Sequence, residues 1–187
     1  MKKLILVILV MLAVSCKNDK NQNINEEQKT KQTENSNKEV VLKEDNILTV
    51  TMSVKVLEDD KFELYYVDDS IDRSFNSEDR IAVYVQANNN FQTIEFKLPE
   101  YSLPYKFRID LGDNSNKHES NVEIKSVTLQ LNQFTIDIDD ATMDSFFQPN
   151  KYLQKINGGY TRKIVDNKYD PFLLAKPVLI KKIELEF

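Results

Sequence analysis

Hydrophobic and polar residues alternate with a period of two along much of the chain after residue 46. In the stretch "ILTVTMSVKV", residues 47–56, apolar side chains occupy every second position from Leu48 to Val56, and threonine, serine or lysine stands between them. Successive side chains of a β-strand point to opposite faces of its sheet. The pattern therefore predicts a strand with one face in a core and the other in water.

The same alternation returns in six further stretches: residues 62–67, 81–85, 91–98, 105–111, 122–131 and 178–187. Short strands separated by short turns, with no convincing helical period, indicate an antiparallel sandwich or barrel. The remaining length is that of one domain. We therefore expect an all-β fold, an antiparallel β-sandwich, over residues 47–187.

Turn residues fit this assignment, because all three glycines lie between predicted strands. The pair Asn157-Gly158 predicts a type I′ hairpin, in which both central residues take positive φ. Residues 137–177 are harder to interpret. Within them, "DDATMDSFF" predicts one short helix inserted between strands, with Asp140 as its N-cap.

The amino terminus has the pattern of a secretory signal. Lys2 and Lys3 precede an apolar run over residues 4–14, which is too short to span a bilayer. We expect residues 1–15 to be a signal peptide.

The only cysteine, Cys16, directly follows this run. The sequence Ala13-Val14-Ser15-Cys16 resembles the lipobox of bacterial lipoproteins. The resemblance implies cleavage before Cys16, lipidation of its thiol and anchoring to a membrane of the cell envelope, which we expect to be the outer membrane. "CKND" is similar to a signal that directs some Bacteroidetes lipoproteins to the cell surface, and the membrane face stays open. The alternative is an ordinary signal peptide that leaves a free thiol.

Residues 17–46 are dominated by Asn, Gln, Lys and Glu. Such a composition cannot bury enough apolar surface to offset its ordering entropy. We therefore expect residues 16–46 to form a lipidated, disordered tether with a reach of roughly 30 Å. The alternative is a surface helix over residues 26–34.

The negative net charge of the chain excludes some classes of binding partner. The formal net charge is −5, and loss of Lys2 and Lys3 with the signal makes it about −7. An acidic chain of this kind is unsuited to sequence-independent nucleic-acid binding, and it disfavours adhesion to anionic lipid headgroups.

Residues 48–131 resemble the jelly-roll β-sandwich domains, similar to carbohydrate-binding modules, of bacterial surface-polysaccharide proteins and uncharacterised exported proteins. The resemblance implies mainly a jelly-roll-like fold, and secondarily a glycan-related role, since one sandwich hosts many functions. It rests on strand and turn patterns at Tyr65, Tyr66, Phe91, Gln92, Leu98, Pro99, Arg108, Ile109, Asp110 and Gly112.

The most polar loop expected in the domain covers residues 67–80. It carries Asp68, Asp69 and Asp72, which are candidate ligands for Ca²⁺ because this ion takes six to eight oxygen ligands. The spacing does not match an EF-hand loop, and a solvated acidic loop is the alternative.

Catalytic motifs are absent from the sequence: it has no GxSxG, HExxH or cysteine cluster, and its single histidine, His118, lies in a polar stretch. We therefore expect no enzyme. A hydrolase with two facing carboxylates is the alternative.

Sugar-binding sandwiches stack pyranose rings on exposed aromatic side chains. This chain has no Trp but eight Tyr, and the adjacent Tyr65 and Tyr66 must point to opposite faces of one strand. We select Tyr66, Arg73 and Arg108 as candidate ligand-binding residues. An ion pair across the sheet explains Arg108 equally well.

Three functions follow as hypotheses. A non-catalytic binding module for glycan or another surface ligand predicts a concave face with tyrosine and polar side chains. A structural or assembly subunit of an envelope complex predicts a contiguous exposed apolar patch. A hydrolase predicts a cleft with convergent acids of perturbed pKa.

Overall fold

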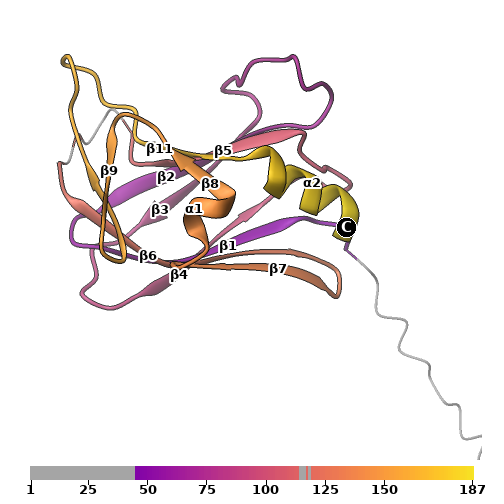
Figure 1. Cartoon of the computed structure of the whole chain (residues 1–187), viewed down its shortest axis with the longest axis horizontal. Coiled ribbons are helices and arrows are strands. Elements are labelled where there is room, and N and C mark those ends of the chain that lie inside the picture. Colours follow the sequence, from indigo (N-terminus) through magenta and orange to yellow (C-terminus); the bar gives the residue numbers. More distant parts are fainter. Residues whose placement is uncertain (1–44, 114–116, 118) are drawn as a thin grey trace, which may run out of the picture. The chain divides into compact units, whose positions relative to one another are not determined.

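Two antiparallel sheets pack face to face in the computed structural model, which describes residues 45–113, 117 and 119–187 (Figure 1). One sheet has the strand order β4-β1-β6-β10-β9, with β7 also paired to β6, and the other has the order β3-β2-β5-β11-β8. The predicted β-sandwich is confirmed. The signal peptide, Cys16 and almost all of the predicted tether lie outside the described residues.

The larger sheet contains β1 (Thr49–Val56), β4 (Gln92–Lys97), β6 (Asn121–Leu131), β7 (Phe134–Asp139), β9 (Leu153–Ile156) and β10 (Gly159–Arg162). The smaller sheet contains β2 (Asp60–Val67), β3 (Arg80–Val85), β5 (Lys106–Leu111), β8 (Phe147–Pro149) and β11 (Phe172–Ala175). The described residues also contain the helices α1 (Met143–Phe146) and α2 (Pro177–Glu186).

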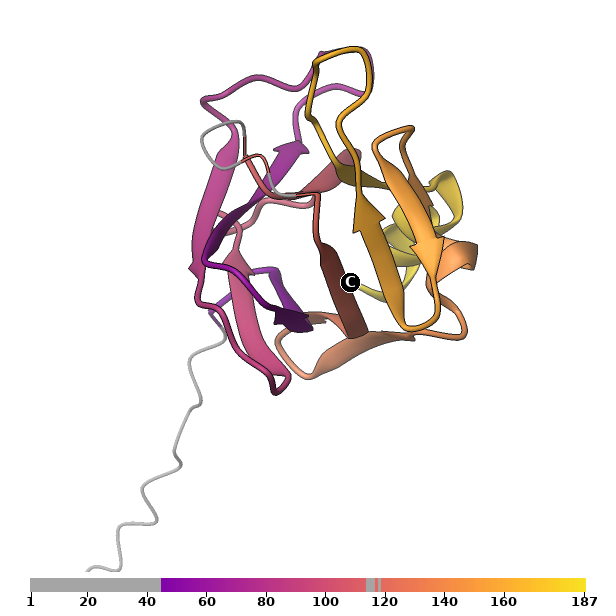
Figure 2. The same ribbon diagram turned by 90° about the vertical axis from the view of Figure 1, so that its left-hand side faces the viewer.

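The alternating apolar side chains form a core between the two sheets. Figure 2 shows the strands arranged around this interior. Met52 and Val54 of β1 are fully buried, as are Phe62 and Leu64 of β2 in the facing sheet. The period-two pattern therefore identified the buried face of each of these strands.

The carboxyl-terminal strand prediction is wrong, because residues 178–187 lie mainly in helix α2. Pro177 occupies the first helical turn, where its missing N–H costs nothing. Leu179 and Ile183, four residues apart, are buried, and Phe187 packs against the core. Residues four apart lie on the same face of a helix. The same stretch also shows an alternation of apolar and polar residues, which is why the sequence pattern predicts a strand there.

The helix predicted near residue 140 exists, but its cap differs from the expectation. Thr142, rather than Asp140, is the N-cap residue of α1. The Thr142 N–H donates to Asp139 Oδ1 over 2.9 Å. Strands β7, β8 and β11 were not predicted; β8 and β11 are only three and four residues long.

The hairpin predicted at Asn157-Gly158 joins β9 to β10. Its type is not I′, because only Gly158 of the two turn residues takes a positive φ, 74°. Gly159 follows, and a Cβ there would lie 2.1 Å from the Val122 carbonyl oxygen of β6. The close approach of β10 to β6 therefore requires a glycine at this position.

A buried ion pair joins the two sheets. Arg162 of β10 and Asp60 of β2 are paired, and neither side chain has any solvent exposure. Arg162 Nη1 also donates to the Leu111 carbonyl oxygen over 2.9 Å, and its Nη2 to Ser120 Oγ over 2.6 Å. Buried charges are tolerated only with such partners.

Candidate functional site

A groove lies between strands β3 and β4 in the described part of the chain. It has a volume of about 580 Å³ and is open to solvent. Val83, Tyr84 and Gln86 line one side, and residues 92–95 line the other. The two strands belong to different sheets but lie side by side, so the groove runs along one edge of the sandwich.

Both strands are sheet edges, since β3 pairs only with β2 and β4 pairs only with β1 among the named strands. Edge strands present backbone N–H and C=O groups that have no partner strand. A ligand in the groove therefore meets backbone donors and acceptors as well as side chains.

Tyr84 is the most exposed large hydrophobic side chain in the described residues, at 82% of its full accessible area. It projects from β3 because the alternation of this strand sends Val83 and Val85 inward. Its ring has a free apolar surface and a hydroxyl group, the combination that suits a polyhydroxylated ligand.

Polar groups surround Tyr84 in the groove. Gln92 Nε2 donates to the Gln86 carbonyl oxygen over 2.6 Å, which fixes one amide side chain against the loop that follows β3. Thr93 and Glu95 are exposed on β4. The lining thus offers amide, hydroxyl and carboxylate groups, and it contains no cationic side chain.

A second polar cluster covers the outer face of the smaller sheet. The Arg108 guanidinium of β5 lies between two aromatic rings, 4.8 Å from the Tyr65 centroid and 4.4 Å from the Phe172 centroid. Phe75 lies 5.7 Å away. These cation–π contacts occupy the ring faces that a sugar would need.

Two carboxylates are buried beneath this stack. Glu63 of β2 and Asp110 of β5 occupy directly opposite positions on neighbouring strands, and each is 5% exposed. Lys61 and Arg80 each approach Glu63 Oε1 to 3.1 Å, and Arg108 Nη2 lies 2.9 Å from Asp110 Oδ2. Asp110 Oδ1 has no hydrogen-bond partner among the described residues.

Burial raises the pKa of Asp110 from 3.8 to about 7, against the lowering effect of Arg108, while Asp170 and Glu63 raise it further. Convergent acids with a perturbed pKa are what a hydrolase would need. Here the acids lie under other side chains rather than in the groove, so a bulky substrate has no access to them.

The three candidate residues chosen from the sequence do not form a site. Tyr66 is 7% exposed and points into the core, so its selection as a ligand contact is wrong. Tyr65 is the partner that faces outward, as its contact with Arg108 shows. Arg73 pairs with Asp69 at 3.0 Å and with Asp79 within its own loop. Arg108 is held by its aromatic and acidic neighbours.

The acidic loop after β2 does not gather its carboxylates around one point. Asp68 accepts a hydrogen bond from Ser102 Oγ over 2.5 Å, and Asp69 pairs with Arg73. Among the residues that the structure describes, no three His, Cys, Asp or Glu side chains are placed to hold a metal ion. Asp68, Asp69 and Asp72 are therefore not assembled into the Ca²⁺ site considered from the sequence. His118 lies outside the described residues.

Comparison with known proteins finds no matching family model, no matching curated protein and no matching solved structure. Within its described part the chain also has no helix that is long and apolar enough to cross a bilayer.

Sequence reasoning missed Tyr84, although a signal for it was present. The alternation of "IAVYV" places Tyr84 on the polar face of its strand, where a large aromatic residue is unusual. Gln92 was noted only as part of a strand pattern. What could not be foreseen is that β3 and β4, edges of different sheets, would come together around these residues.

Proposed function

We propose that the protein is a lipid-anchored lipoprotein of the cell envelope whose β-sandwich is a non-catalytic binding module for neutral glycans. The observation that carries the binding proposal is the groove at β3 and β4, in which the highly exposed ring of Tyr84 stands among polar side chains. Concave surfaces with an aromatic side chain and a few fixed polar groups are typical of ligand sites.

The charge of the groove favours a neutral ligand. Glu95 is its only ionisable carboxylate, and no lysine or arginine lines it. Glu95 pairs with Lys97 over 3.8 Å, so its charge is partly balanced and the groove presents no cation of its own to a uronic acid, sulfate or phosphate. A single carboxylate also argues for binding without hydrolysis, because glycosidases use two carboxyl groups across the scissile bond.

We expect neutral oligosaccharides to bind with a dissociation constant on the order of micromolar to millimolar, since the groove is shallow. Tyr84→Ala should weaken binding roughly tenfold or more, because it removes the stacking surface. Tyr84→Phe should retain most of the affinity. A glycan array followed by titration calorimetry measures both effects.

Tyr105→Ala is the matched control, since Tyr105 is also exposed, at 51%, but lies outside the groove. Binding that is unchanged in Tyr84→Ala would place the ligand elsewhere. If the wild type binds no glycan and instead captures one envelope protein in stoichiometric amount, the assembly-subunit alternative replaces the binding module.

The anchoring part of the proposal is supported by the position of Cys16 directly behind the apolar run. Cys16→Ser should abolish acyl labelling and move the protein from the membrane fraction to the soluble fraction. Retained acyl labelling in this variant would contradict the proposal. A thiol that carries no lipid in the wild type would contradict it equally.

A further inference from the structure

Exposed apolar side chains gather at the end of the domain where the described chain begins, around Asn46. We call this surface the Asn46 end. Its exposed fractions are 75% for Tyr101, 51% for Tyr105, 48% for Phe134 and 38% for Leu103. Isolated apolar side chains on a surface are ordinary, but several at one end indicate a contact surface.

Hydrogen bonds bring the segments that carry these side chains together. The Tyr101 N–H donates to the Asn46 carbonyl oxygen over 2.9 Å, and Asn132 Nδ2 donates to Asn46 Oδ1 over 3.2 Å. Phe134 begins β7 directly after the turn at Asn132, where it pairs with Leu131. The loop before β5 and the hairpin between β6 and β7 therefore meet at the start of β1.

Tyr101 has an unusual backbone conformation for its size. Its φ is 65°, in the left-handed region that a bulky residue seldom adopts. The hydrogen bond to Asn46 holds it there, yet the ring stays largely in solvent and contributes little to the core. A strained backbone is often retained at a functional position. Because the Tyr101 ring does not stabilise the core, we take its exposed position as a sign that it contacts something outside the domain.

The chain itself indicates what that contact is. Residues 16–44 precede the described domain, which starts at this end, and Cys16 is the proposed lipid anchor. We infer that Tyr101, Leu103, Tyr105 and Phe134 form a lipid-contact surface that docks the Asn46 end on a zwitterionic bilayer. This inference rests on the proposed anchoring through Cys16.

The chemistry of the surface fits a bilayer interface. Tyrosine rings combine an apolar body with a polar tip and concentrate at the headgroup level of membranes. Asp45 and Glu100 are exposed beside them, which favours zwitterionic over anionic headgroups. Tethering raises the effective concentration of the surface at the membrane to the millimolar range, so a weak contact suffices.

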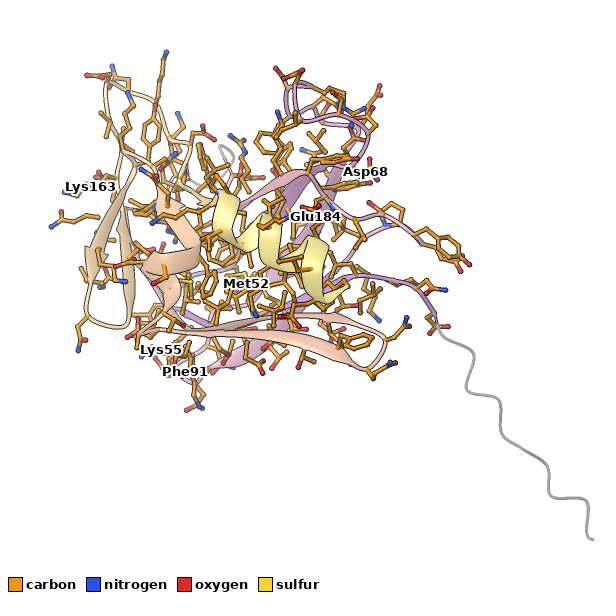
Figure 3. All side chains as sticks on the ribbon, turned by 45° about the vertical axis from the view of Figure 1, so that its right-hand side comes forward. Met52, Lys55, Asp68, Phe91, Lys163 and Glu184 are labelled. Atoms are coloured by element: carbon orange, nitrogen blue, oxygen red, sulfur yellow. The ribbon has the colours of Figure 1, made fainter. Side chains whose placement is uncertain are left out.

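Docking at this end would turn the ligand groove away from the bilayer. Leu98 directly follows β4, and its N–H donates to the Leu48 carbonyl oxygen next to the Asn46 end. Gln92 in the groove instead pairs with Val54 near the far end of β1. Phe91 and Lys55 mark that distant side in Figure 3. The groove would then face ligands beyond the membrane surface.

The chain offers a direct test, because it has one cysteine and no tryptophan. The mature chain, residues 16–187, is coupled through Cys16 to a maleimide phospholipid in phosphatidylcholine vesicles. In one protein Tyr101→Trp supplies the only tryptophan, and in the matched control Phe91→Trp supplies it at the opposite end. Circular dichroism melts confirm that both proteins fold.

We expect a shift of emission to shorter wavelength and quenching by brominated lipid in the Tyr101→Trp protein, and neither effect in the Phe91→Trp protein. Absence of quenching in both, or equal quenching in both, overturns the inference. Emission that shifts with protein concentration in the absence of vesicles also overturns it, because a second copy would then cover the surface. Maleimide coupling supplies the anchor, so these outcomes do not depend on whether Cys16 is lipidated in the cell.

Discussion

Replacing Arg162 with methionine is expected to lower the free energy of unfolding by about 3–5 kcal/mol. The substitution leaves Asp60 fully buried without its charged partner, and it removes the hydrogen bonds to Leu111 and Ser120. A buried charge without a partner is among the costliest defects in a protein. Urea denaturation of the wild type and the variant measures the difference.

A double variant, Arg162→Met with Asp60→Leu, should be less destabilised than Arg162→Met alone, because no uncompensated charge remains. Arg73→Met is the matched control for loss of a charged side chain at a partly exposed ion pair, and it should cost no more than about 1 kcal/mol. An Arg162→Met protein with a loss as small as that of Arg73→Met would refute the role assigned to the buried pair.

The second large effect is a pH dependence carried by Asp110. Its pKa is raised to about 7 in the folded protein, whereas the ordinary value is 3.8. Between these values the folded state binds a proton that the unfolded state has released. Stability contributed by this group is therefore lost as the pH rises from about 4 to about 7.

Asp110→Asn removes this titration while keeping the shape of the side chain. The stability of the variant relative to the wild type should rise across that pH interval, by at most about 4 kcal/mol for a shift of this size. Denaturant unfolding at several pH values between about 4 and about 8 measures it. Asp166→Asn is the control, because Asp166 is 82% exposed and pairs only loosely with Lys151, at 3.9 Å. Parallel stability curves for the wild type and Asp110→Asn would contradict the prediction.

The clustered charges around Asp110 show which of the two sequence interpretations of Arg108 holds, namely the ion pair rather than the ligand contact. Lys106, Arg108 and Asp110 alternate with the apolar Phe107 and Ile109 and so share the outer face, which made Arg108 a candidate ligand contact, with an ion pair as the equal alternative. In the folded protein the same residues satisfy one another, since Tyr65 and Phe172 enclose the guanidinium and Asp110 binds it. Which residue of the Tyr65-Tyr66 pair faces outward depends on strand register, because a shift of one residue exchanges the two faces.

Local pattern alone determined the β-sandwich class and the strands up to residue 131, because alternation of side chains is a property of each strand and needs no knowledge of its neighbours. The alternation in residues 81–85 also contained the information that Tyr84 faces away from Val83 and Val85, although Tyr84 was not selected from it. The tertiary structure decided everything that joins distant segments. Arg162 meets Asp60 across 102 residues of chain, and the groove forms only where the edges of two sheets meet. Tertiary contacts also decided the carboxyl-terminal helix. The apolar positions of residues 178–187 fit a strand with a period of two as well as a helix with a spacing of four. Burial of Leu179 and Ile183 in the core favours the helix.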